Sequence, residues 1–380
     1  MGDYGATVIK IEPPEGDRYR TLKGAWPVDY NWLLTSRNKH SIAIDLKKPE
    51  GRRIMHRLAE QADVFLTNFI GDDLKRYEME YSTIRALNNQ IIFAHVTGYG
   101  EDGPDVRKRA FDATAWWASS GLMEFVRAQG SEPAVSAPGM GDHATSMSLF
   151  SAICAGLYRR ERIGQGCYVS TSLVANGVWS NGMGLQGVLS GVDLSERRQQ
   201  GSSYPFGRVY RTKDGESVLL SIVNVSKEWS KLMTALDLDE FSEDPRFSSL
   251  QDIIVNRVEV VAILDARFAE MTIDQAVTGL IENQVTHSQV KSMPQVVTDQ
   301  QLEINEVIVP TASDDPDYQQ TIMSPIQIAE EDKLAPNKAP EVGANSIEVL
   351  ETYLELSPQE IKGLIESEII ATERKVADRK

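Results

Sequence analysis

Cysteine and histidine are scarce in this sequence. Its 380 residues include two cysteines, Cys154 and Cys167, and five histidines. Two cysteines form neither a disulfide framework nor a paired metal-binding motif, so we expect a reducing, cytoplasmic environment. The histidines show no HExxH or comparable ligand spacing, which predicts that the chain has no metal site. They are His40, His56, His95, His143 and His287.

Long hydrophobic runs are also missing. No apolar run approaches the roughly 18 residues of a membrane span, and residues 1–5 lack the basic and apolar regions of a signal peptide. With 41% apolar residues, a chain of 380 can bury a sizeable core and divide into about two domains. We therefore expect a globular protein that does not interact with a membrane.

Positive charge is deficient only in the second half. Residues 1–200 hold 23 basic and 23 acidic residues, so the whole net charge of −16 lies beyond them. Such a negative field repels nucleic acid, which excludes it as an expected partner. The first half carries small basic clusters, each suited either to a small anion or to a solvated surface. They are Arg107–Arg109, Arg37–Lys39 and Lys47–Lys48.

Hydrophobic periodicity predicts alternating strands and helices in the first hundred residues. Four segments have strand patterns, and the segments 48–61 and 81–88 between them have helical patterns. This order predicts a parallel sheet with ligands at the carboxyl ends of its strands, at Thr67–Phe69 and Val96–Gly98. The four strand segments are Thr7–Ile11, Ser41–Asp45, Asp63–Thr67 and Gln90–Val96.

A glycine-rich loop with one acid, Gly139–Ala144, precedes the apolar segment Met147–Tyr158. Its glycines permit a tight turn and the close approach of a ligand, and the following helix would direct free N–H groups at that ligand. Asp142 fits two roles here. It is either the N-cap of the helix or an exposed nucleophile.

Two segments imitate the dinucleotide-binding fingerprint. Gly98–Gly103 matches G-x-G-x-x-G, but Glu101 and Asp102 would repel a pyrophosphate and Pro104 does not open a helix. Gly139–Ala144 matches G-x-G-x-x-A, but no acid closes the strand that follows, where a ribose-binding acid belongs. A nicotinamide-dependent enzyme is therefore disfavoured.

An ordered series of blocks resembles the class III CoA-transferases, the family that includes formyl-CoA transferase and the carnitine CoA-transferases. The blocks cover nearly the whole chain, and many blocks in the right order are far more specific than one. They are Gly5–Glu12, Arg37–Asp45, Pro49–Gly51, Ala62–Phe69, Gly98–Pro104, Phe111–Asp112, Ser120–Gly121, Gly141–Asp142, Arg159–Gly166, Val169–Leu173, Ala339–Gly343 and Glu348–Leu350.

The resemblance implies an enzyme whose nucleophile is Asp142. Such an enzyme moves coenzyme A from an acyl-CoA donor to a carboxylic acid acceptor through an aspartyl mixed anhydride and an aspartyl-CoA thioester. It holds no tightly bound cofactor, because acyl-CoA is its substrate. The positions that contact CoA in the family fall on Ile44, Lys47, Asn68, Phe69, Arg76 and Arg109.

The resemblance also implies an α/β fold that forms an interlocked homodimer. A large Rossmann-like domain with a parallel sheet would comprise residues 1–190 and 325–380, and a smaller α/β domain residues 205–310. Linkers would occupy residues 191–204 and 311–324. The sequence pattern adds a strand at Ser217–Ile222, a helical stretch at 252–271 and helices at Ser346–Leu354 and Pro358–Glu366.

Departures from the family pattern leave two alternatives open. The family has a strand and an Ala-Gly-Pro-like loop upstream of the block that starts here at Gly2, so one alternative is a catalytically silent acyl-CoA-binding protein. The other is a racemase-like isomerase, although the family's racemases have a histidine where Phe111 stands, and phenylalanine cannot move a proton. His143 and Phe111–Asp112 resemble the subgroup that acts on 2-hydroxy or aryl acids. The sequence does not name the donor, the acceptor acid or the role of His143.

Overall fold

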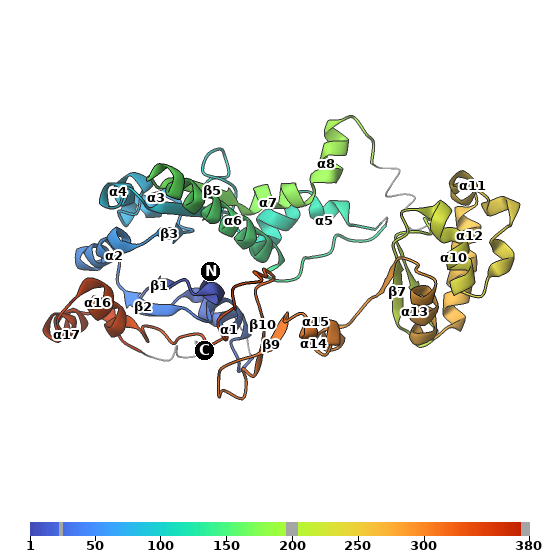
Figure 1. The fold of residues 1–380 in the computed structure, drawn as a ribbon. Helices are drawn as coiled ribbons and strands as arrows, with labels where there is room; N and C mark the ends of the chain where they lie inside the picture. Colours follow the sequence, from blue (N-terminus) through green and yellow to red (C-terminus); the bar gives the residue numbers. More distant parts are fainter. Residues whose placement is uncertain (23–25, 129, 195–203, 374–380) are drawn as a thin grey trace. The chain divides into compact units, whose positions relative to one another are not determined.

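The structure is a computed structural model, which describes residues 1–22, 26–128, 130–194 and 204–373 (Figure 1). The chain is a mixed α/β protein and forms two compact units. The larger unit comprises Met1–Leu122, Val135–Asn181 and Thr298–Lys380, and the smaller comprises Met123–Ala134 and Gly182–Val297. The domain limits expected from the sequence stay a prediction.

A three-stranded parallel sheet forms the centre of the larger unit. Its strands are β3 (Val64–Thr67), β4 (Ile92–Thr97) and β5 (Cys167–Ser172), with β4 in the middle. The apolar run at the start of β4 is completely buried, as expected for a strand covered on both faces. The long helix α6 (Met140–Ile163) packs on this sheet, and helices α2 (Pro49–Gln61) and α4 (Tyr81–Leu87) contribute to its other core cluster.

A second sheet contains the first two strands of the chain. β1 (Ile9–Glu12) pairs in parallel with β2 (His40–Ile44), and β11 (Ile370–Ala371) pairs with β2 in antiparallel orientation. The consecutive strands predicted from the sequence are therefore divided between two sheets. Helix α2 joins both cores, because Ile54 packs in the cluster of β2 while Met55 belongs to the cluster of β4.

Helices α16 (Ser346–Leu354) and α17 (Pro358–Glu366) cover the second sheet with an apolar cluster that includes Val349 and Ile361. Both helices have the bounds predicted from the sequence. The other elements of the larger unit are η1 (Gly2–Tyr4), η2 (Arg18–Thr21), α1 (Tyr30–Ser36), α3 (Gly71–Arg76), the π-helix η3 (Asp112–Ala118), α7 (Leu173–Ser180), α15 (Gln300–Ile304), β9 (Ile308–Pro310) and β10 (Gln320–Ile322); the short helix α5 (Leu122–Phe125) begins where the first segment of this unit ends.

The smaller unit has its own hydrophobic core around an antiparallel sheet. β7 (Ser217–Leu220) lies between β6 (Arg208–Arg211) and β8 (His287–Gln289) and is shorter than the predicted strand. The predicted helical stretch 252–271 is two helices, α11 (Leu250–Val255) and α12 (Arg257–Glu270). The remaining elements are α8 (Gly182–Leu189), α10 (Val225–Ala235), η4 (Asp239–Phe241), η5 (Pro245–Phe247), α13 (Ile273–Glu282) and α14 (Met293–Val297).

Candidate functional site

Asp142 lies in the first turn of α6. The helix begins at Met140, and its N-cap is Gly139, whose φ of 78° is in the left-handed region that favours glycine. Asp142 is the third helical residue and makes no capping hydrogen bond, so the N-cap interpretation of this residue is wrong. Its position instead exposes the carboxylate at the positive end of a 24-residue helix.

Gly141 packs directly against the π-helix η3. A Cβ atom on Gly141 would lie 2.6 to 2.8 Å from three side-chain atoms of Trp116, so only glycine fits without a shift of the neighbouring ring. The Gly141 N–H donates to Oδ2 of the buried Asp112 at 3.3 Å. These two contacts fix the start of α6 against η3 and thereby set the position of Asp142.

The surroundings of Asp142 make its charge less favourable than the charge of a fully solvated carboxylate. Loss of water around the carboxylate raises its pKa, the nearby negative charge of Asp112 raises it further, and His143 opposes both effects. The ring of His143 turns back toward Gly139, where an added Cβ would come within 3.5 Å of it. A less hydrated carboxylate is a stronger nucleophile once it is ionised.

Tyr19 is a neighbour of this site that the sequence reasoning missed. Burial raises the pKa of the Tyr19 hydroxyl, a bond to Thr35 opposes this, and the charge of Asp142 then contributes to the rise. Tyr19 therefore lies within electrostatic range of Asp142. Residues 19 and 142 belong to different sequence blocks, and no local pattern relates them.

The turn η2 that carries Tyr19 is held by a buried ion pair. Arg20 donates to both carboxylate oxygens of Glu12 at 2.7 and 2.8 Å, and the Ser41 hydroxyl donates to Glu12 at 2.7 Å. The guanidinium of Arg20 also lies 3.6 Å from the ring centroid of Trp32. This cluster of side chains thus joins strands β1 and β2, turn η2 and helix α1.

The predicted CoA-contacting residues all lie in the larger unit, and five of the six are exposed. Lys47, Arg76 and Arg109 make no ion pair with any residue that the structure describes, so their charges are available to an anion. Asn68 and Phe69 follow the carboxyl end of β3 and are also exposed. Ile44 is different, because the residue is 1% exposed in the apolar core of β2, so the structure does not present it to a ligand.

A buried histidine fixes the loop that carries Asn68 and Phe69. His95 on β4 is 3% exposed, and its Nε2 lies 2.8 Å from the carbonyl oxygen of Phe69. Its Nδ1 lies 2.7 Å from the hydroxyl of Tyr168 on β5, which donates to Glu101 at 2.5 Å. These groups line a cavity of about 260 Å³ at the carboxyl ends of the parallel strands.

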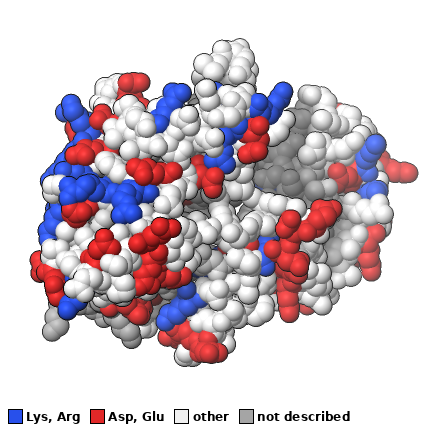
Figure 2. Space-filling model, turned by 60° about the vertical axis from the view of Figure 1, so that its left-hand side comes forward, with Lys and Arg blue, Asp and Glu red and all other residues white. Residues whose placement is uncertain are grey.

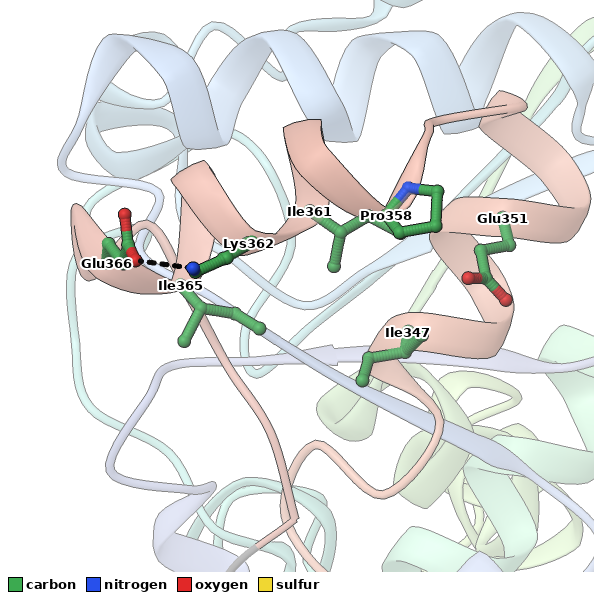
Figure 3. A pocket seen from close by; sticks show the side chains of 7 residues that line it. All are labelled: Ile347, Glu351, Pro358, Ile361, Lys362, Ile365 and Glu366. Carbon is green, nitrogen blue, oxygen red and sulfur yellow. Dashed lines mark ion pairs between the residues drawn. The ribbon is translucent and has the colours of Figure 1, made fainter.

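A larger hollow of about 400 Å³ lies between α16 and α17 (Figure 3). Isoleucine side chains line it, and Lys362 and Glu366 form an exposed ion pair 3.6 Å long at its edge. It contains none of the predicted site residues. The shape of this hollow is therefore not evidence about the reaction.

The surface charge is patchy. Figure 2 shows a compact group of basic side chains among acidic ones on one face of the molecule. Among the described residues, no group of three or more His, Cys, Asp and Glu side chains is arranged to hold a metal ion. None of the helices in the described part of the chain has the length and apolar character needed to span a bilayer.

Comparison with known sequences gives matches along nearly the whole chain. A family model described as CoA-transferase family III matches residues 1–346. The (R)-2-hydroxy-4-methylpentanoate CoA-transferase of Clostridioides difficile is 29% identical over 377 residues, which are 97% of this chain and 94% of that protein. The cinnamoyl-CoA:phenyllactate CoA-transferase of Clostridium sporogenes is 27% identical in an alignment 380 positions long, which covers 96% of this chain and 90% of that protein.

Solved structures share the fold. The crystal structure of a CaiB/BaiF family protein from Brucella suis superimposes with a TM-score of 0.78 at 24% identity, covering 92% of this chain and 93% of that one. A crystal structure of Rv3272 from Mycobacterium tuberculosis gives a TM-score of 0.79 at 24% identity, covering 90% and 91%. At this identity the match establishes the fold alone.

Proposed function

The chain belongs to CoA-transferase family III, and we propose that it transfers coenzyme A between carboxylic acids through covalent intermediates on Asp142. The observation that carries this proposal is the position of Asp142. It is an exposed carboxylate in the first turn of a long helix, next to a glycine that a side chain cannot replace without clashing with Trp116. A carboxylate at such a place can attack a thioester without a general base.

The reaction requires four balanced steps. The Asp142 carboxylate attacks the acyl carbonyl of the donor, and the C–S bond breaks to give a mixed anhydride and CoA thiolate. The thiolate attacks the aspartyl carbonyl and releases the donor acid, leaving an aspartyl-CoA thioester. The acceptor carboxylate attacks that thioester and expels the thiolate, which then takes the acceptor acyl group and regenerates Asp142. The free energy of the thioester bond is retained in each intermediate, so the reaction consumes no ATP.

The start of α6 supports these steps electrostatically. The N–H of Asp142 donates to no described residue, while its neighbours Gly141 and His143 donate to Asp112 and to the Gly139 carbonyl. A free N–H beside the reacting carbonyl, together with the positive end of the helix, suits the oxyanion of each tetrahedral intermediate. Because these donors are fixed by packing, they need no rearrangement during the reaction.

We assign CoA binding to the exposed members of the predicted set. Lys47, Arg76 and Arg109 suit the phosphates, and Phe69 suits the adenine ring or the pantetheine arm. Phe69 already stacks at an angle against Tyr77, with ring centroids 5.8 Å apart. The guanidinium of Arg76 lies 5.4 Å from the same tyrosine ring, which places a cation beside this aromatic surface.

We propose that the acids are monocarboxylic with apolar acyl groups. Phe111 and Met140, which flank Asp112 and the start of α6, are 70% and 48% exposed. Asp112 itself would repel a second carboxylate on the substrate. The two clostridial relatives are named for (R)-2-hydroxy-4-methylpentanoate and for cinnamoyl-CoA and phenyllactate. A mouse relative, 34% identical over 275 residues, and a relative from Agrobacterium fabrum are named for succinate and glutarate.

We further propose a cytoplasmic, interlocked homodimer with a Rossmann-like larger domain. Large apolar side chains are left uncovered on α7 and α8, including Trp179 at 84% and Met183 at 95% exposure. Monomeric proteins rarely expose such a set, so a second copy of the chain is the expected cover. The two free cysteines are consistent with a reducing compartment.

Trapping the covalent intermediate tests the proposed function. The protein is incubated with 4-methylpentanoyl-CoA or succinyl-CoA and quenched with hydroxylamine, and its peptides are analysed by mass spectrometry. We expect a hydroxamate at Asp142 that is absent in Asp142→Ala and unchanged in Asp102→Ala, which removes another exposed carboxylate and serves as a control. CoA binding without any adduct would instead support the silent acyl-CoA-binding protein, and α-proton exchange without an adduct would support the racemase.

A further inference from the structure

The hydrogen bonds of His95 fix how many protons its network must hold. Three contacts run in series, from the Phe69 carbonyl to His95, from His95 to Tyr168, and from Tyr168 to Glu101, at 2.8, 2.7 and 2.5 Å. Each contact is a hydrogen bond only if one proton lies in it, because a carbonyl and a carboxylate can only accept. The complete network therefore needs three protons.

A neutral histidine, a neutral tyrosine and an ionised glutamate supply only two protons between them. The complete network thus holds one additional proton and is electrically neutral as a unit. Without that proton one contact must fail. If the Tyr168 hydroxyl donates to the Glu101 carboxylate, the single proton of a neutral His95 lies on Nδ1 or on Nε2. On Nδ1 it completes the bond to Tyr168 and leaves the bare Nε2 facing the Phe69 carbonyl.

We propose that His95 is a positioning residue for CoA binding, and that one proton shared among His95, Tyr168 and Glu101 couples this network to the loop bearing Asn68 and Phe69. This inference rests on the proposed function, since that loop is assigned to CoA. The Phe69 N–H bonds to Thr67 at 3.2 Å, the Ile70 carbonyl accepts bonds from Asp73 and Leu74, and the Phe69 ring stacks against Tyr77. The contact with His95 adds a bond from the Phe69 carbonyl to a side chain of β4.

The groups around the network of His95, Tyr168 and Glu101 are consistent with a protonated Tyr168. Burial raises the pKa of the Tyr168 hydroxyl, as do its bond to Glu101 and the charge of Glu101, so tyrosine keeps its proton. The other titratable groups that line the cavity are Glu80 and Tyr81. Neither makes a hydrogen bond to His95, and Tyr81 meets Tyr168 edge to face with centroids 5.3 Å apart.

Glu101→Gln allows all three hydrogen bonds to form without the additional proton, so it tests the proton independently of the bonds. The amide of glutamine can donate to the Tyr168 oxygen, which lets tyrosine donate to Nδ1 and leaves Nε2–H on the Phe69 carbonyl, all without an additional proton. Tyr168→Phe instead removes the middle link and keeps the ring that stacks on Phe93. Tyr81→Phe removes a hydroxyl from an adjacent ring and serves as the matched control.

The experiment is calorimetric titration of coenzyme A into the full-length protein from about pH 6 to about pH 9. We expect wild-type affinity to weaken by roughly tenfold as the shared proton is lost, the Glu101→Gln profile to be flat, and Tyr168→Phe to be weaker by a similar factor at low pH. The ionisation of CoA itself changes the affinity of every variant equally, so its effect cancels when variants are compared at the same pH. A Glu101→Gln profile equal to wild type, or Tyr168→Phe equal to Tyr81→Phe, would overturn the inference.

Hydrogen–deuterium exchange of the peptide that covers residues 66–72 gives a second readout without ligand. Exchange should be faster in Tyr168→Phe than in wild type and unchanged in Tyr81→Phe. Equal exchange in all three proteins overturns the positioning role. A wild-type protein that binds no CoA contradicts the proposed function, whereas the exchange experiment still decides the role of His95.

Discussion

Gly141 is the residue of the site that is least open to substitution. We expect Gly141→Ala to destabilise the protein by about 1–3 kcal/mol, because the added methyl group would overlap Trp116 and the ring is packed in the core. Urea denaturation measures this. Gly363→Ala in α17 is the control, since nothing lies within 4 Å of the added atom and the change should stabilise the helix slightly.

Asp142 is expected to lower stability in exchange for reactivity. Its pKa is raised in the folded state, so the ionised carboxylate destabilises the fold above that pKa, and the effect vanishes below the ordinary value of 3.8. Asp142→Asn should therefore abolish transfer yet stabilise the protein at neutral pH, on the order of a few tenths of a kcal/mol after solvent screening. Thermal denaturation against pH measures the difference. Equal melting temperatures at neutral pH would contradict this prediction.

The residues of the site differ in how far the sequence could reveal them. Asp142 stood out because glycines preceded an acid and an apolar helix followed. Tyr19 and His95 did not, because their partners lie in distant segments and the bonds form only after the strands pair. The buried state of Ile44 was likewise hidden, since it depends on α16 packing over β2.

At the scale of elements, the pair Glu12–Arg20 joins β1, β2 and η2. Burial alone would raise the pKa of Glu12, but the bonds from Arg20 and Ser41 outweigh it and leave the pKa below 4.5. Arg20→Met should cost about 3–5 kcal/mol at neutral pH, because it leaves a buried charge unpaired. The difference from wild type should shrink as the pH falls through the pKa of Glu12.

Denaturation of Arg20→Met at neutral and acid pH tests this prediction. Lys10→Met removes the partly exposed pair between Lys10 on β1 and Asp17, the N-cap of η2, and should cost no more than about 1 kcal/mol. A cost for Arg20→Met that matches the cost for Lys10→Met would show that the buried pair does not hold the turn.

Elements defined by local chemistry were predicted best. Helix α17 begins with a capping box in which Ser357 and Glu360 exchange hydrogen bonds, and its predicted bounds are confirmed. Helix α6 starts seven residues earlier than its apolar segment indicated, because Gly139 adopts a left-handed conformation that no pattern marks. The division of the strands between two sheets was also not predictable, since pairing is non-local.

At the scale of the molecule, the uncovered apolar side chains of α7 and α8 predict a dimer. Light scattering should give a mass twice the 42.2 kDa of one chain. If the chains are interlocked, dilution should not separate them, because separation requires unfolding. The mass should therefore fall only in the denaturant range where the circular dichroism signal of the helices is lost. A monomer at micromolar concentration would contradict the prediction.

The pairing of β11 with β2 also has a consequence for synthesis. β2 ends at Ile44 and pairs with Ile370, which is translated long after β2. The smaller unit, with its own core, lies between them in the chain and can fold first. The sheet of β1 and β2 therefore lacks its third strand, β11, while the smaller unit is synthesised, and the edge of β2 stays unpaired for that time.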